Sequence, residues 1–281
     1  MKNIMIVLLS LLWTSVSYAQ DDITICHTTS TEKFASFASN ENFNKEHPLP
    51  LAYIHETHEG GKMIQFKTPD GKDASGYLIE AKKKTDVWLF VFQEWWGLND
   101  NIKRQSESLF KDLGNVNVIA LDMYDGKLAT DRETAGSYMQ QFKQERGDAI
   151  IKGALNLAGS NAKIGTIGWC FGGGQSLLAS LIAGDKAAAC VIYYGMPVDD
   201  VSRLKTLKSD VLGIFATKDQ YINPQVVQKF EANMKAAGKK VTIKNYSADH
   251  AFANPSNPIF DKEATEDAYK YTVAFLKEKL K

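Results

Sequence analysis

The sequence predicts an α/β fold in which a mostly parallel β-sheet is covered by helices on both faces. From about residue 62 onward, short apolar runs alternate with amphipathic segments, which is the pattern of strands separated by helices. The run Val87–Phe92 is apolar throughout, as expected of a strand that is buried on both faces. A length of 281 residues, of which 44% are hydrophobic, suits one large domain of this class.

The first predicted elements are two strands joined by a tight turn. The segment Pro69-Asp70-Gly71-Lys72 has typical turn residues, and a β-prone stretch lies on either side of it. The elements expected in the first half of the chain are strands at Met63–Thr68, Ser75–Glu80, Val87–Phe92 and Val116–Met123, and a helix at Asn101–Leu113 that stops at Gly114.

The second half continues the alternation of helices and strands. One long helical stretch is expected from about Asp131 to Leu157, and an apolar helix at Gln175–Ala183 follows a strand at Ile164–Trp169. The remaining expected elements are strands at Ala187–Tyr194, Val211–Ala216 and Val241–Tyr246, and helices near Pro224–Ala237 and Glu263–Leu280. Since no internal repeat or low-complexity linker is found, we predict a single α/β domain over residues 59–281.

The N-terminus has the parts of a secretory signal peptide. Lys2 supplies positive charge, residues 4–13 form an apolar run, and the segment Ser17-Tyr18-Ala19 fits a cleavage site. We therefore predict a signal peptide over residues 1–19 and a secreted or periplasmic protein, with an uncleaved membrane anchor as the alternative. Residues 20–58 are polar with scattered aromatics and are predicted to form an irregular N-terminal extension.

Composition excludes several classes of protein. Lys and Arg number 33 and Asp and Glu number 33, so the chain lacks the basic excess that non-specific nucleic-acid binding requires. Three cysteines cannot form a disulfide-rich scaffold, although a bridge between Cys26 and Cys190 after export is an open alternative to a buried free thiol at Cys190. The expected partner is a small-molecule substrate, with neither nucleic acid nor, after cleavage, membrane involved.

The segment Gly168-Trp169-Cys170-Phe171-Gly172 carries the strongest chemical signal. It follows a predicted strand and opens a helix, which is the setting of a nucleophile elbow with Cys170 as the nucleophile. The backbone N–H of Phe171, at the start of the new helix, is a candidate oxyanion-hole donor. The alternative is a glycine-rich turn that contains an incidental buried cysteine.

A thiol nucleophile needs a histidine as its base and an acid that orients the histidine. In proteins with a nucleophile elbow, the acid follows the nucleophile along the chain and the histidine comes last. His250 is the only histidine after Cys170, and it follows the strand predicted at Val241–Tyr246. Asp219 comes just after the strand at Val211–Ala216 and is the expected acid. Asp249 is the weaker candidate because it adjoins the histidine and cannot readily reach around to orient it.

The segment Gln93-Glu94-Trp95-Trp96-Gly97 follows another buried strand. The second oxyanion-hole amide usually comes from such a position, which here gives the N–H of Trp95. Glu94 leaves an apolar run beside two tryptophans, and this environment is expected to raise its pKa. The alternative for Glu94 is an ordinary surface carboxylate at a strand end.

Taken together, Gln93-Glu94, Gly168-x-Cys170-x-Gly172-Gly173, Asp219 and His250-Ala251-Phe252 resemble the dienelactone hydrolase family. The resemblance extends from about residue 60 to the C-terminus. It implies an α/β-hydrolase fold, a Cys170–His250–Asp219 triad, and neither a metal nor an organic cofactor. It also implies that Glu94 contacts the resting thiol, and that the substrates are cyclic enol-lactones such as carboxymethylenebutenolide.

The substrate-binding side of the resemblance is less complete. Arg132 matches one of two arginines with which family members bind a substrate carboxylate, although a surface arginine on a helix is the alternative. The other arginine would follow His-x-Phe-Ala, where this chain has Asn254. Trp96 and Phe252 are further candidates for substrate contact.

The sequence therefore predicts an exported cysteine hydrolase of esters or lactones. Two alternatives stay open: a related α/β-hydrolase that acts as an acyltransferase or peptidase, and a non-catalytic protein that binds a small molecule.

Overall fold

The computed structural model describes residues 29–51 and 54–281, and the signal peptide predicted over residues 1–19 lies outside this part. Within the described residues the chain forms an eight-stranded sheet with the strand order β1-β2-β4-β3-β5-β6-β7-β8. The strands are β1 (Lys62–Lys67), β2 (Asp73–Ile79), β3 (Val87–Phe92), β4 (Asn117–Leu121), β5 (Lys163–Trp169), β6 (Ala187–Tyr193), β7 (Asp210–Ala216) and β8 (Val241–Tyr246).

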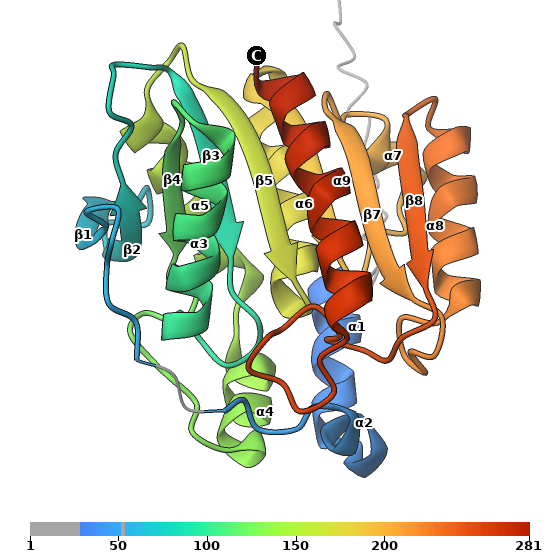
Figure 1. Cartoon of the computed structure of the whole chain (residues 1–281). Helices are drawn as coiled ribbons and strands as arrows, with labels where there is room; N and C mark the ends of the chain where they lie inside the picture. The colour runs from blue at the N-terminus through green and yellow to red at the C-terminus, as the bar shows by residue number, and fades with distance from the viewer. Residues whose placement is uncertain (1–28, 52–53) are drawn as a thin grey trace, which may run out of the picture.

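The sheet is mostly parallel, as the sequence predicts. Strand β2 runs antiparallel to both β1 and β4, whereas neighbouring strands from β4 to β8 are parallel. Parallel neighbours need crossover connections, and helices supply them. The carboxyl ends of β3, β5, β7 and β8 consequently point to the same edge of the sheet, at the bottom of Figure 1.

Helices cover both faces of the sheet (Figure 1). Helices α3 (Asp100–Leu113) and α9 (Lys262–Leu280) pack together on one face, and α5 (Gln144–Ala158) and α6 (Phe171–Ala183) on the other. The other helices are α1 (Ser30–Ser36), α2 (Glu41–Glu46), α4 (Arg132–Gln141), α7 (Val201–Leu204) and α8 (Pro224–Ala236), with short 3₁₀ turns at Phe37–Ser39 and Gly184–Lys186. In the described part of the chain, no helix is both long and apolar enough to cross a membrane.

The long helix predicted from Asp131 to Leu157 is wrong in one respect, because the structure divides it into α4 and α5. Phe142 adopts an extended conformation (φ −62°, ψ 130°) and caps the end of α4. Its ring packs against Phe171 and Tyr124 beside the elbow. A tertiary contact thus breaks a segment whose apolar spacing is otherwise continuous.

The prediction of an irregular N-terminal extension is also wrong for residues 30–46. Thr29 and Glu32 form a capping box at the start of α1, and the Asn40 side chain caps α2. Phe34 and Phe43 are fully buried, so these short helices belong to the hydrophobic core. Tertiary packing stabilises them, since helices of this length are marginal on their own.

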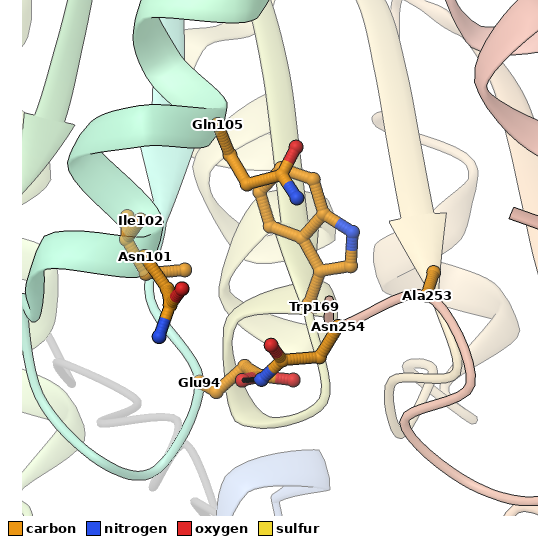
Figure 2. A pocket seen from close by; sticks show the side chains of 7 residues that line it. All are labelled: Glu94, Asn101, Ile102, Gln105, Trp169, Ala253 and Asn254. Carbon is orange, nitrogen blue, oxygen red and sulfur yellow. Dashed lines mark hydrogen bonds between the residues drawn. The ribbon is translucent and has the colours of Figure 1, made fainter. Parts of the chain in front are cut away.

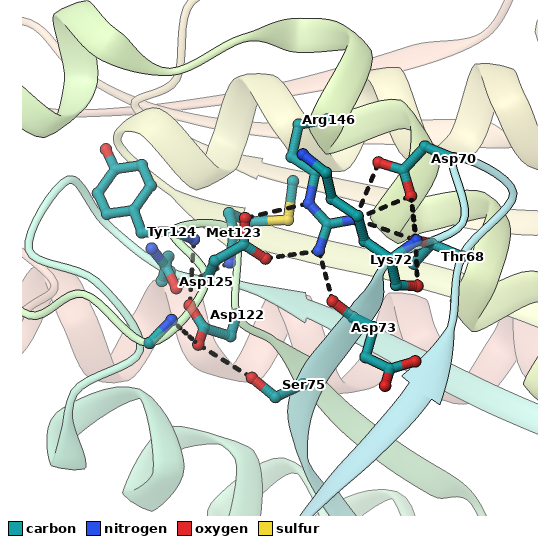
Figure 3. Close-up of polar contacts among 12 residues, drawn as sticks. Thr68, Asp70, Lys72, Asp73, Ser75, Asp122, Met123, Tyr124, Asp125 and Arg146 are labelled. Atoms are coloured by element: carbon teal, nitrogen blue, oxygen red, sulfur yellow. Dashed lines mark hydrogen bonds and ion pairs between the residues drawn. The ribbon is translucent and has the colours of Figure 1, made fainter.

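Arg146 on α5 ties the antiparallel edge of the sheet to the body of the domain (Figure 3). Its guanidinium donates hydrogen bonds to Asp70 in the β1–β2 turn, to Asp125 after β4 and to the carbonyl of Asp73. The side chain is largely buried and reaches two carboxylates, which makes this ion pair stronger than an exposed one.

Candidate functional site

The predicted chemical groups gather at the carboxyl edge of the parallel strands. Cys170 follows β5, Asp219 follows β7, His250 follows β8 and Glu94 follows β3. All four side chains are buried. In open α/β sheets this edge is the usual place for a site, because loops from neighbouring strands converge there.

Cys170 lies on a strained turn between β5 and α6. Its backbone has φ 57° and ψ −121°, a conformation that a residue with a side chain rarely adopts. The turn is crowded: a Cβ at Gly168 would overlap the carbonyl of Gly172, and a Cβ at Gly172 would overlap the carbonyls of Phe92 and Gln93. This is the geometry that a nucleophile elbow requires.

His250 and Asp219 form a buried pair. His250 Nδ1 lies 2.5 Å from Asp219 Oδ2, whereas Asp249 is exposed. The other carboxylate oxygen of Asp219 accepts backbone N–H bonds from Tyr221 at 2.9 Å and Ile222 at 2.8 Å. The bond between His250 Nδ1 and Asp219 directs the second ring nitrogen of His250, Nε2, away from the aspartate.

The charges of this pair stabilise each other. Burial alone would raise the pKa of Asp219, but His250 and the two backbone N–H groups outweigh it and lower that pKa. Burial alone would lower the pKa of His250, but Asp219 and Cys170 raise it well above its ordinary value. The pair is therefore suited to receive a proton from a neighbouring thiol.

His47 belongs to the site, although it is not among the residues predicted from the sequence. Its Nε2 atom lies 3.8 Å from Cys170 Sγ, and its Nδ1 lies 2.6 Å from the carbonyl oxygen of Phe43. The His47 ring packs on the rings of His250 and Trp95, with centroid distances of 4.5 and 4.8 Å. In the sequence, His47 is followed by Pro48-Leu49-Pro50, which indicates only a turn and carries no sign of a contact 123 residues away.

Burial governs the protonation of His47 and Cys170. His47 is 3% exposed, and burial together with the charge of His250 lowers its pKa well below its ordinary value. Burial also raises the pKa of the Cys170 thiol, while His250 and the Phe171 N–H oppose that rise. In this conformation His47 is a neutral imidazole facing the sulfur.

The segment Thr29–Leu51, hereafter the cover segment, lies across the site. Phe43 anchors it by packing against Trp95 and Tyr221, with ring centroids 5.5 and 4.9 Å apart. Polar contacts attach the segment to the rest of the domain along its length. They include Lys33 with Asp199 at 2.5 Å and Arg132 Nε with the His47 carbonyl at 2.9 Å. Cys170, whose sulfur contacts His47 of this segment, is 1% exposed.

The contact of Arg132 bears on its predicted role. Arg132 begins α4, is solvent-exposed, and donates its Nε–H to the cover segment. In this conformation it positions His47. Binding of a substrate carboxylate by Arg132 stays a prediction.

Glu94 pairs with Asn254 (Figure 2). Asn254 Nδ2 donates to Glu94 Oε2 at 2.6 Å, and burial raises the pKa of Glu94 to about 7. The contact between Glu94 and the resting thiol, which the resemblance implies, is not among the hydrogen bonds of the described residues; His47 Nε2 faces the sulfur. Asn254, which stands where an arginine was expected, thus binds the glutamate.

A small cavity adjoins this pair (Figure 2). Its volume is about 10 Å³, which is room for about one water molecule. Glu94 and Asn254 lie near the Trp169 indole, and the lining residues are Glu94, Asn101, Ile102, Gln105, Trp169, Ala253 and Asn254.

The aromatic candidates are all buried. Trp95 and Trp96 pack edge to face with centroids 5.1 Å apart, and Trp95 contacts His47. Phe252 packs against Tyr194 and Tyr246, and its carbonyl accepts hydrogen bonds from the Asp261 N–H and the Thr265 hydroxyl at the start of α9. Phe252 therefore fixes the His250 loop in this structure, and substrate contacts by Phe252 and Trp96 stay predictions.

The thiol and the two imidazoles are close enough to share an ion. The Cys170 sulfur and one ring nitrogen from each of His47 and His250 all lie within 4.8 Å of one another. In the described residues this is the one cluster of at least three histidine, cysteine or carboxylate groups with metal-ligand spacing.

Comparison with known proteins identifies relatives of this chain and agrees with its fold. Residues 74–280 match the family model of the dienelactone hydrolase family. The chain is 31% identical over 232 residues to Protein usf of Aquifex pyrophilus, covering 78% of this chain and 99% of that protein. It is 29% identical over 228 residues to carboxymethylenebutenolidase 1 of Cupriavidus pinatubonensis, covering 76% and 95% respectively.

A solved structure has the same fold. A dienelactone hydrolase-like promiscuous phosphotriesterase from metagenomic libraries superposes with a TM-score of 0.68 at 20% identity, covering 79% of this chain and 99% of that one. The family match spans most of the chain, and the Aquifex relative is covered almost end to end. The chain therefore belongs to the dienelactone hydrolase family and is a hydrolase with the α/β-hydrolase fold.

Proposed function

We propose that the protein hydrolyses small carboxylic esters or lactones through a thioester on Cys170. The observation that carries this proposal is the buried His250–Asp219 pair next to a cysteine on a strained elbow. A nucleophile, an oriented imidazole and a carboxylate are the three groups that acyl transfer to a thiol requires.

In the first step, His250 Nε2 takes the proton of the Cys170 thiol, and the sulfur attacks the acyl carbon. The N–H groups of Phe171 and Trp95 are the proposed donors to the resulting oxyanion, each contributing about 3–4 kcal/mol. Collapse of the intermediate breaks the acyl–oxygen bond, and the imidazolium of His250 returns its proton to the leaving alkoxide. The product of this step is a thioester and an alcohol; for a lactone both stay in one molecule.

In the second step, neutral His250 takes a proton from water as the water oxygen attacks the thioester. The carbon–sulfur bond breaks, the thiolate leaves and regains the proton from His250, and the carboxylic acid is released. Asp219 stays ionised throughout and stabilises the imidazolium, which its lowered pKa supports.

The site is closed over its nucleophile in this conformation. The cavity beside Glu94 and Asn254 has a volume of about 10 Å³, and neither Cys170 nor His250 lines it. Because Cys170 is 1% exposed, the cover segment has to move before an acyl group reaches the sulfur.

The test compares the wild type with Cys170→Ala and with Cys190→Ala as the matched control. Cys190 is buried on β6, and its sulfur lies 3.6 Å from Ser176 Oγ on α6, so it is not part of the triad. We expect hydrolysis of an activated ester and an enol-lactone by the wild type and Cys190→Ala, and an acyl adduct on the Cys170 peptide by mass spectrometry. Equal rates for the wild type and Cys170→Ala would exclude the mechanism.

We also propose that the protein acts outside the cytoplasm, on the strength of the Lys2, apolar 4–13 and Ala19 pattern. Fractionation of expressing cells, with sequencing of the mature N-terminus, tests this. A protein found only in the cytoplasm and starting at Met1 would contradict it.

A further inference from the structure

The contact between His47 and Cys170 has the spacing of a metal site. Zinc bonds of about 2.3 Å to sulfur and about 2.0–2.1 Å to nitrogen place two tetrahedral ligand atoms about 3.6 Å apart. The distance of 3.8 Å between His47 Nε2 and Cys170 Sγ is within a few tenths of an ångström of that value. A nitrogen of His250 completes a set of three ligand atoms within 4.8 Å of one another, so the widest of these separations has to shorten by roughly 1 Å when the ion binds.

Both imidazoles are oriented as metal ligands usually are. A ligating histidine typically uses its other ring nitrogen to bind a carboxylate or a backbone carbonyl. His250 Nδ1 is bound to Asp219, and His47 Nδ1 is bound to the carbonyl of Phe43. These bonds leave the two Nε2 atoms for a third group, and the buried His250 interacts with the Cys170 thiol on that side.

The charges also fit a divalent ion. A buried ion of charge +2 is costly unless nearby anions neutralise it. The Cys170 thiolate and the Asp219 carboxylate together supply two negative charges, and the histidines are neutral as ligands. One sulfur and two nitrogens are the donors that zinc prefers over magnesium or calcium.

We propose that His47, Cys170 and His250 form a binding site for a borderline-soft divalent metal ion, with Zn²⁺ as the probe. On binding, the Cys170 S–H proton leaves to solvent and a sulfur–zinc bond replaces it, while the two imidazoles bind through their neutral nitrogens. A fourth position is filled by water. No oxidant or reductant is required.

Bound zinc would cross-link the cover segment to the body of the domain. His47 comes from the cover segment, whereas Cys170 and His250 come from the sheet edge. The ion therefore holds the segment closed and, where the proposed hydrolysis applies, removes both nucleophile and base from reaction. Only this inhibition rests on the proposed function; the binding itself does not.

The experiment titrates tag-free wild type with Zn²⁺ by calorimetry, in two buffers that differ in ionisation enthalpy. Parallel titrations use His47→Gln, Cys170→Ala and the control His58→Gln, an exposed histidine outside the cluster. Co²⁺ replaces Zn²⁺ in a second measurement, because a thiolate ligand gives a charge-transfer band that water and imidazole do not. Circular dichroism and thermal unfolding establish that each variant folds.

We expect the wild type and His58→Gln to bind one Zn²⁺ per chain with release of a proton, and Cys170→Ala to lose the Co²⁺ band. His47→Gln should bind at least about 100-fold more weakly, since loss of a supporting contact alone costs 10–100-fold. The site would be overturned if folded His47→Gln bound Zn²⁺ as tightly as the wild type. It would also be overturned if a wild type with a free, reduced Cys170 bound no Zn²⁺. Neither of these binding measurements requires the protein to hydrolyse esters, so they test the metal site even if the proposed function fails.

Discussion

The cover segment makes a specific prediction about Phe43, its buried anchor. Phe43 is fully buried and contacts Phe34, His47, Trp95 and Tyr221 through its ring. Replacing it with alanine removes these contacts and leaves a cavity. We expect Phe43→Ala to release the segment from the site while the α/β domain stays folded, because the segment pairs with no strand of the sheet.

The magnitude follows from the burial of the ring. Truncating a fully buried phenylalanine to alanine costs about 3–5 kcal/mol. If about 3 kcal/mol of that loss falls on docking of the segment, the opening equilibrium rises about 150-fold, at about 1.4 kcal/mol for each factor of ten. Alkylation of Cys170, which requires opening, should accelerate by a similar factor.

The assay is the rate of iodoacetamide labelling of the Cys170 peptide, followed by mass spectrometry, with hydrogen exchange of residues 29–51 in parallel. Phe230→Ala is the matched control: this ring is equally buried, but it lies on α8. The control should lower the free energy of unfolding and leave Cys170 labelling nearly unchanged. A labelling rate in Phe43→Ala equal to that of the wild type would refute the proposed opening.

Three further predictions address the triad, the elbow and a polar cluster under α3. Asp219→Asn should lower kcat for ester hydrolysis by roughly 10²–10⁴-fold with the fold intact, because the imidazolium loses its partner; steady-state kinetics measure this. Gly172→Ala should give little folded protein or a much lower thermal midpoint, since its Cβ would overlap two carbonyls. Glu107 has a pKa lowered to about 2: burial alone would raise it, but hydrogen bonds from Thr57, Tyr77 and the His58 N–H outweigh burial. The ionised Glu107 stabilises the fold fully above the unfolded pKa of 4.5, and this stabilisation is lost as the pH falls toward 2. Between pH 7 and pH 3, the free energy of unfolding measured in urea should therefore fall by about 2 kcal/mol more in the wild type than in Glu107→Gln.

Each of these predictions has an outcome that contradicts it. Unchanged kcat in Asp219→Asn would mean that the aspartate does not act through His250. A Gly172→Ala protein as stable as the wild type would show that the elbow can relax. Parallel pH profiles for wild type and Glu107→Gln would remove Glu107 from the acid-sensitive groups.

The elements of the sheet could be predicted because their signals are local. Val87–Phe92 is an apolar run in the sequence and is strand β3 with the same bounds. The elbow at Cys170 and the chain order of Asp219 and His250 follow from a rule about strand ends, so the structure brings these residues together where the sequence placed them. The position of a residue at the end of its own strand is determined by the residues next to it in the sequence.

The contributions of distant segments could not be predicted in this way. His47 lies 123 residues from Cys170, and no periodicity links them. The helices of the cover segment had detectable signals, namely the Thr29–Glu32 capping box and the Asn40 cap, but they are too short for an apolar pattern. The bond between Asn254 and Glu94 depends in the same way on two loops that meet only in the folded chain.

The long range of the contacts that hold the cover segment bears on the order of folding. Its partners lie far along the chain: Thr31 contacts Gln144, Lys33 contacts Asp199, and Asn40 contacts Tyr221, 181 residues away. Contacts at such separations form only after the intervening chain has been ordered, because closing a long loop costs entropy that no local bond offsets. We therefore expect this segment to dock after the sheet has formed. Protection of the Cys170 thiol would then mark the last step of folding.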